Sequence, residues 1–74
     1  MSAPHGTLIH VTLNGAHREF TAPPTFAQLI EEMSLAGRRI AVERNGEIVP
    51  RSGFATTRLA DGDRIEVVVA VGGG

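Results

Sequence analysis

A chain of 74 residues has room for one small domain and excludes a catalytic domain joined to a separate substrate domain. With 42% hydrophobic and 20% charged residues, it is expected to fold rather than to remain disordered. The net charge of −1 argues against nucleic-acid binding through bulk positive charge, and the lack of cysteine excludes disulfides, thiolate nucleophiles and zinc–thiolate sites.

Residues 1–7 are expected to form a flexible leader, and they lack the apolar run of a signal peptide. No stretch of the sequence approaches the ~20 apolar residues that a membrane-spanning helix requires. The sequence therefore predicts a cytoplasmic protein that does not act at a membrane.

Residues 8–13 alternate in polarity and predict a β-strand. Its inward side chains would be those of Ile9, Val11 and Leu13. The following Asn14-Gly15 pair is typical of a two-residue hairpin turn, because both positions of a type I′ turn need a positive φ. A returning strand is expected over residues 17–21, and Pro23-Pro24 would end it.

A short helix is expected after these prolines. Thr25 followed by Gln28 fits a capping box, in which each side chain accepts a hydrogen bond from the other residue's backbone N–H. The apolar stripe at helical spacing comprises Phe26, Leu29, Ile30 and Met33. Gly37 is placed to terminate the helix.

The second half of the chain predicts three further strands. Residues 39–44 alternate in polarity, and Asn45-Gly46 predicts a second hairpin that returns through residues 47–49. Residues 51–58 have no regular pattern, although Phe54 and Leu59 are expected to close one edge of the core. The segment Asp61-Gly62-Asp63 is typical of a turn, and the last strand should cover residues 64–71.

This element order predicts an α+β fold for residues 8–71, a mixed sheet of four to five strands with one helix packed across one face. The first and last strands are the most apolar and are expected at the centre of the sheet. The helix would be the only cover of the core. Residues 72–74 would form a flexible C-terminal tail.

The tail, Gly72-Gly73-Gly74, is the most informative feature of the sequence. Three residues without a Cβ atom form, when extended, a thread of about 10 Å that fits a narrow channel. Gly72 and Gly73 would thread into the active site of another enzyme and present the Gly74 carboxylate there. A carboxylate is a poor acyl donor, so that enzyme would have to activate it, and adenylation with ATP is expected. The alternative is a frayed end without a function.

The outward face of the last strand suggests a docking surface beside this tail. Val68 and Ala70 should lie on that face, and Leu8 and His10 are expected next to them on the neighbouring strand. A cluster of exposed apolar residues indicates partner binding, whereas single ones do not. The alternative is an ordinary sheet surface.

Two other groups of polar residues predict no chemistry. His10 and His17 flank the first turn, but no carboxylate or thiolate was found to complete a metal site with them, and His5 lies in the leader. Asp61 and Asp63 are more typical of a turn than of a catalytic carboxylate pair. No metal, bound cofactor or catalytic residue is predicted, and the protein is not expected to be an enzyme.

Four stretches of the chain match one known family. They are residues 13–15 (LNG), residues 40–51 (IAVERNGEIVPR), residues 59–67 (LADGDRIEV) and the terminal diglycine. On these stretches, residues 8–74 resemble the ThiS family, the sulfur carriers of thiamine biosynthesis, which have a ubiquitin-like β-grasp fold. Many ubiquitin-like chains share the diglycine, so the two longer stretches are the more specific. The leader departs from the family, whose members begin almost at the first strand.

The resemblance implies a sulfur-carrying cosubstrate. A ThiF-like adenylyltransferase would adenylate the Gly74 carboxylate with ATP, and a sulfur donor such as a cysteine desulfurase would supply the sulfur of a C-terminal thiocarboxylate. Thiazole synthase (ThiG) would use that sulfur to build the thiazole moiety of thiamine. The free carrier would be a monomer, with no bound cofactor and no nucleic-acid partner.

Three alternatives remain from the sequence. The small subunit of molybdopterin synthase (MoaD-like) uses the same tail chemistry, but that family usually has prolines before the diglycine, whereas this chain has Val69-Ala70-Val71. A ubiquitin-like protein modifier is a second alternative, although all seven basic residues are arginine and chains built on internal lysines are excluded. The third is an interaction domain whose tail has no role.

Overall fold

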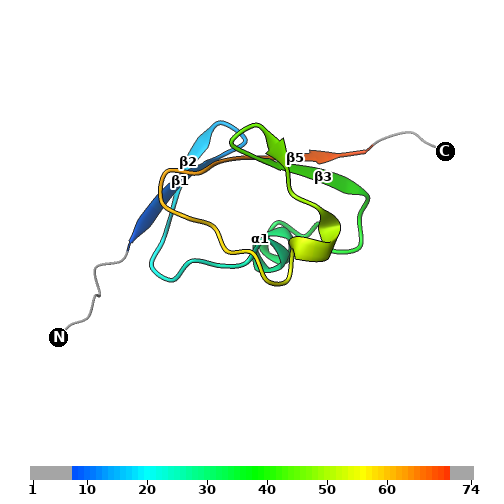
Figure 1. The fold of residues 1–74 in the computed structure, drawn as a ribbon, viewed down its shortest axis with the longest axis horizontal. Helices are drawn as coiled ribbons and strands as arrows, with labels where there is room; N and C mark the ends of the chain where they lie inside the picture. Colours follow the sequence, from blue (N-terminus) through cyan, green and yellow to red (C-terminus); the bar gives the residue numbers. More distant parts are fainter. Residues whose placement is uncertain (1–7, 71–74) are drawn as a thin grey trace.

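The computed structural model describes residues 8–70, which form a five-stranded mixed sheet with a helix on one face (Figure 1). The strands are β1 (Ile9–Leu13), β2 (Ala16–Phe20), β3 (Ile40–Arg44), β4 (Glu47–Ile48) and β5 (Arg64–Val69), and the helix is α1 (Phe26–Glu32). The strand order is β2-β1-β5-β3-β4, in which β1 and β5 are parallel and the other neighbours antiparallel. The predicted α+β architecture is therefore confirmed, with the last strand at the centre of the sheet and the first beside it.

Both predicted Asn-Gly turns are present. Asn14 and Gly15 have φ values of 50° and 83°, and Asn45 and Gly46 have values of 52° and 87°. Asparagine and glycine tolerate this left-handed region better than other residues, which explains their use in these two-residue turns. The first turn fixes the register of β1 against β2, so that His10 lies opposite Glu19.

The predicted capping box at the start of α1 is also confirmed. Thr25 Oγ1 accepts a hydrogen bond from the Gln28 N–H at 3.1 Å, and Gln28 Oε1 accepts one from the Thr25 N–H at 2.8 Å. The next two free donors are satisfied by tertiary contacts, because the N–H groups of Phe26 and Ala27 bond to backbone carbonyls of residues 57 and 54. These bonds attach the irregular segment 51–59 to the helix.

The prediction that Gly37 ends the helix is wrong. The helix ends at Glu32, and Ser34 adopts the left-handed conformation with φ 63°. The Ser34 N–H bonds to the Glu31 carbonyl and the Leu35 N–H to the Ile30 carbonyl, the two bonds of a Schellman cap. At seven residues α1 is far shorter than a membrane span, and no helix within residues 8–70 is long and apolar enough to cross a bilayer.

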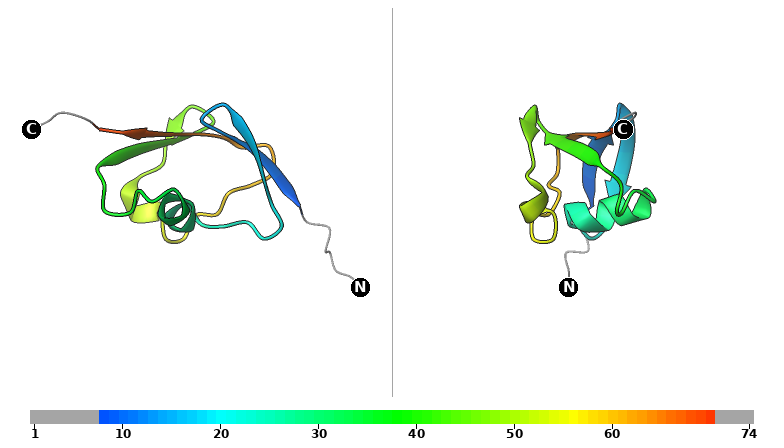
Figure 2. Two further views of the ribbon diagram at one scale, coloured as in Figure 1. Left: turned by 180° about the vertical axis from the view of Figure 1, so that it is seen from behind. Right: turned by 90° about the vertical axis from the view of Figure 1, so that its right-hand side faces the viewer.

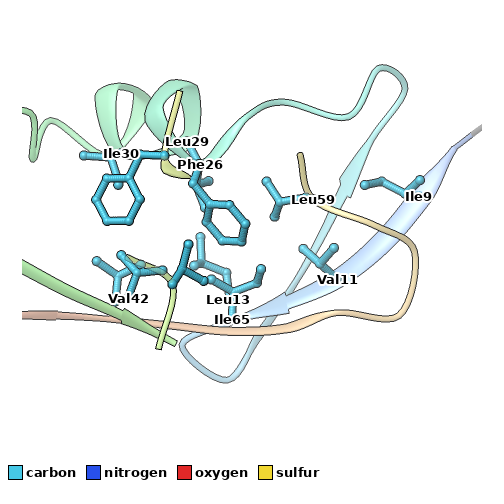
Figure 3. Close-up of a cluster of buried hydrophobic side chains, with 12 residues drawn as sticks. Ile9, Val11, Leu13, Phe26, Leu29, Ile30, Val42, Leu59 and Ile65 are labelled. Carbon is cyan, nitrogen blue, oxygen red and sulfur yellow. The ribbon is translucent and has the colours of Figure 1, made fainter. Parts of the chain in front are cut away.

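The core lies between one face of the sheet and a second layer that covers this face (Figures 2 and 3). The sheet contributes inward residues such as Val11, Val42 and Ile65, which are packed under Phe26 of α1. The helix is not the only cover, contrary to the prediction, because Leu59 also fills the core from the segment that follows β4. Helix and segment therefore act as one covering layer, joined by the backbone bonds at the start of α1.

A buried carboxylate joins the start of β5 to the β3–β4 turn. The Asp63 side chain, 8% exposed, accepts hydrogen bonds from Arg44 Nε at 2.9 Å, Asn45 Nδ2 at 3.2 Å and the Ala60 N–H at 2.9 Å. The Arg44 guanidinium also donates to the Arg58 carbonyl at 2.7 Å. Because the charge is paired and hydrogen-bonded on several sides, its burial is tolerated.

We expect Asp63→Ala to lower the free energy of unfolding by about 3 kcal/mol, because the change leaves an arginine and two N–H donors without their acceptor. Asp61→Ala is the matched control in the same turn. It removes one hydrogen bond, from the His10 N–H to Asp61 Oδ1 at 2.8 Å, and should cost about 1 kcal/mol. Urea unfolding of both variants measures the difference, and equal losses would contradict the role given to Asp63.

Candidate functional site

The carboxyl end of β5 is the part of the fold that leads to the predicted tail. Gly72, Gly73 and Gly74 lie outside the described residues. Up to Ala70 the chain is tied to the sheet, since Val69 pairs with Ile40 and the Ala70 N–H donates to the Arg39 carbonyl at 2.9 Å. Whatever follows Ala70 therefore begins from a fixed position at one end of the central strand (Figure 1).

Side chains of both hairpin turns hold β5 from either side. The Asn14 amide accepts from the Val67 N–H at 2.8 Å and donates to its carbonyl at 3.3 Å, so it takes the place of a strand neighbour where β1 has turned away. On the other side, Asn45 Oδ1 accepts from the Arg64 N–H at 2.8 Å. Successive residues of a strand point their backbone N–H and carbonyl groups to opposite sides. The N–H and carbonyl of Val69 therefore point the same way as those of Val67, to the side of β5 along which β1 no longer runs.

An exposed apolar patch lies on the outward face of the sheet near the end of β5. We call it the outer patch, and it comprises Ala41, Ile48, Val68 and Ala70. Val68 is 61% exposed and lies opposite Ala41 of β3. Two residues further along β3, Glu43 lies opposite Ile48 of β4, which is 64% exposed. Glu43 is also the cross-strand partner of Glu66 of β5, so two carboxylates lie beside the apolar residues of the patch. Val68 and Ala70 were predicted for this surface, whereas Ala41 of β3 and Ile48 of β4 were not, because their position depends on the order of the strands in the sheet.

Leu8 and His10 do not adjoin the outer patch, contrary to the expectation from the sequence. The strands β1 and β5 are parallel, and their register places Thr12 opposite Arg64. Leu8 therefore precedes that pair by four residues while Val68 follows it by four, which separates them by about 25 Å along the strands. Leu8 is exposed, at 41%, at the other end of the sheet.

The surroundings of His10 and His17 differ from those expected. Glu19, on the same outward face, contributes the carboxylate that the sequence analysis did not find for these histidines. Its Oε2 lies 3.1 Å from His17 Nε2 and 3.4 Å from His10 Nδ1. A period of two along β2 and the cross-strand pairing of His10 with Glu19 produce this cluster. The alternation of the return strand was the signal that could have found it.

The hydrogen bond from His17 lowers the pKa of the exposed Glu19 carboxyl below its ordinary value of 4.5, and the positive charge of both imidazoles adds to this effect. A carboxyl whose pKa is lower in the folded state stabilises the fold above its unfolded pKa. That stabilisation is lost as the pH falls through the folded pKa.

We expect His17→Ala to raise the pKa of Glu19 toward its ordinary value, because the largest cause of the shift is removed. An NMR titration of the glutamate side-chain carboxyl signals measures the midpoint in metal-free buffer. His5→Ala is the control and should leave the midpoint unchanged. A Glu19 midpoint that stayed in place in His17→Ala would show that the contact is not formed in solution.

Asp61 and Asp63 do not form a carboxylate pair facing a common substrate position. Asp63 is buried and bonded to groups of the fold, whereas Asp61 is exposed and accepts from the His10 N–H. Both therefore organise the turn before β5, in agreement with the prediction of a structural turn.

Comparison with known families identifies the chain. The sequence model of the ThiS family matches residues 11–74. The chain belongs to the ThiS family. Two of the matching stretches have a structural role here, since Arg44 and Asn45 of residues 40–51 and Asp63 of residues 59–67 form the network at the start of β5.

A solved structure confirms the β-grasp fold. The thiamine biosynthesis protein ThiS from Geobacter metallireducens superimposes with a TM-score of 0.73 at 29% sequence identity, over 89% of this chain and 100% of that one. This ThiS-family chain therefore shares its ubiquitin-like architecture with a protein of the same family name.

Two kinds of relative are similar in sequence. A protein named thiazole synthase from Paramagnetospirillum magneticum is 44% identical over 64 residues, which are 86% of this chain and 20% of that protein. The chain thus spans about a fifth of the length of that relative. The uncharacterized protein ycf40 of Pyropia yezoensis is 33% identical over 66 residues, which are 89% of this chain and 93% of that one.

Proposed function

We propose that this protein is a cytoplasmic sulfur carrier that donates sulfur from a C-terminal thiocarboxylate on Gly74 to thiazole synthase. The observation that carries the proposal is the family match over residues 11–74, which includes the triple glycine. A 44% identical segment within a protein named thiazole synthase supports a working relationship between carrier and synthase. A carrier encoded within the same chain as its acceptor would be kept at a high effective concentration.

The chemistry requires an activating partner. The Gly74 carboxylate attacks the α-phosphate of ATP in a ThiF-like adenylyltransferase, which forms an acyl adenylate and releases pyrophosphate. The terminal sulfur of a persulfide on a donor such as a cysteine desulfurase then attacks the acyl carbon and displaces AMP, which forms an acyl disulfide. A thiol reductant cleaves its S–S bond, which leaves the thiocarboxylate on Gly74 and a disulfide between the reductant and the donor. The chain has no cysteine, so its own side chains offer no thiol to carry the sulfur.

The carrier is expected to gain the mass difference between sulfur and oxygen when it is incubated with ATP, the activating enzyme and a sulfur source. Intact-mass spectrometry measures this change. Gly74→Ala should fold normally but convert poorly, because the added methyl group crowds a channel shaped for glycine. Deletion of Gly73-Gly74 should abolish the change. A constant mass for the unaltered protein, under conditions that convert an established carrier, would refute the proposal.

The outer patch is proposed as the surface that the activating enzyme and thiazole synthase contact. It lies at the end of β5, so a partner that covers it would also receive the chain that follows Ala70. Large exposed side chains such as Val68 and Ile48 are 61% and 64% exposed and contribute little to the core. Clustered exposed apolar side chains of this kind are typical of partner interfaces.

We expect Val68→Arg to weaken the binding of thiazole synthase about tenfold or more, since a charge would replace an apolar contact at the proposed interface. Leu8→Arg is the matched control, because Leu8 is an exposed apolar residue at the other end of the sheet. Isothermal titration calorimetry compares both variants, and their melting temperatures should equal that of the unaltered protein. Equal affinities of the two variants would remove the outer patch from the interface. Binding to the large subunit of molybdopterin synthase instead would favour the MoaD-like alternative.

A further inference from the structure

We infer that His10, His17 and Glu19 form a binding site for a divalent transition-metal ion of borderline softness, with Zn²⁺ as the best fit. The cluster lies on the outward face of β1 and β2, and each residue contributes one potential ligand atom. Two imidazole nitrogens and one carboxylate oxygen make up the ligand set of several zinc sites that keep a coordination position open. The proposed sulfur carriage does not use these residues.

The size of the cluster agrees with tetrahedral coordination. The three atoms His10 Nδ1, His17 Nε2 and Glu19 Oε2 are separated by 3.1, 3.4 and 3.5 Å, which is close to an equilateral triangle. With Zn–N and Zn–O bonds of about 2.0–2.1 Å, two ligand atoms of a tetrahedral site lie about 3.3–3.4 Å apart. A zinc ion above the centre of this triangle therefore reaches all three atoms at normal bond lengths after small side-chain adjustments.

The backbone beneath the cluster is held on both sides, which fixes where the three side chains begin. His10 and Glu19 are direct partners in the β1–β2 ladder, and His17 lies two residues before Glu19 on the same face. On the other side of β1, the His10 N–H donates to Asp61 and the His10 carbonyl accepts from the Gly62 N–H at 2.7 Å. Only side-chain rotations are left to order when the ion binds, so the entropic cost of binding is small.

Exposure of the cluster leaves room for a further ligand. The side chains of His10, Glu19 and His17 are 49%, 47% and 61% exposed, so the fourth coordination position faces solvent and can hold water or a ligand from another molecule. Exposed ion pairs of this kind add little to stability. Substitution of these residues therefore tests metal binding without unfolding the protein.

The test is a titration of the full chain with ZnCl₂ by isothermal titration calorimetry, combined with NMR of the histidine side chains. We expect one Zn²⁺ per chain and shifts of the His10 and His17 imidazole signals. His17→Ala and Glu19→Ala should each weaken binding by about 100-fold, because loss of even an outer-sphere partner of a metal ligand costs about 10–100-fold. Mg²⁺, which prefers oxygen ligands, should not compete.

His5→Ala is the matched control, because it removes the chain's remaining histidine and leaves the cluster intact. Its affinity for Zn²⁺ should equal that of the unaltered protein, and all variants should give equal melting temperatures in metal-free buffer. Equal affinity in His17→Ala and the unaltered protein would overturn the proposal. So would a loss of binding confined to His5→Ala, or an absence of saturable binding. A failure of sulfur transfer would leave this result unaffected, since the assay needs no activating enzyme.

Discussion

The position of the central strand β5 depends on polar side chains that reach it from outside the sheet ladder. The buried Asp63 carboxylate fixes its start by joining the β3–β4 turn to the loop before β5. Asn14 and Asn45 then bond to its backbone from opposite sides. In a domain with so small a core, such directional contacts select one arrangement among many that would bury similar apolar area. The family-matching stretches thus contain the residues that fix the position of β5, the strand that precedes the C-terminal glycines.

The fold was predictable from the sequence because its local signals agree with one another. Two Asn-Gly turns, a capping box and alternating strands each specify a short segment, and together they allow few topologies. The end of α1 was not predictable in the same way. Gly37 has the better intrinsic propensity for a left-handed cap, but Ser34 adopts that conformation and allows both carbonyls of the last turn to be bonded. Gly37 is also left-handed, with φ 83°, but it lies beyond the point at which the bonds around Ser34 have ended the helix.

The candidate sites were predictable only where they depend on one strand. The outward position of Val68 and Ala70 followed from alternation along the chain, but their neighbours depend on strand order and direction. Parallel pairing of β1 with β5 places Leu8 at the far end of the sheet, and antiparallel pairing of β3 with β5 places Ala41 beside Val68. Glu19 was within reach of the sequence, because it follows His17 by two residues and the two-residue Asn14-Gly15 turn sets the register that pairs it with His10. The three terminal glycines were evident from the sequence itself.

Parallel pairing also places the start of β1 and the end of β5 at opposite ends of the sheet. The first strand starts at one end of the sheet, and the central strand finishes at the other (Figure 1). A polypeptide joined ahead of β1 would therefore lie at the end of the sheet that is opposite to the outer patch. A purification tag or a further domain attached there would leave the end of β5 accessible to another protein. The fold is in this sense suited to fusion ahead of β1, because the added chain would not lie beside the end of β5.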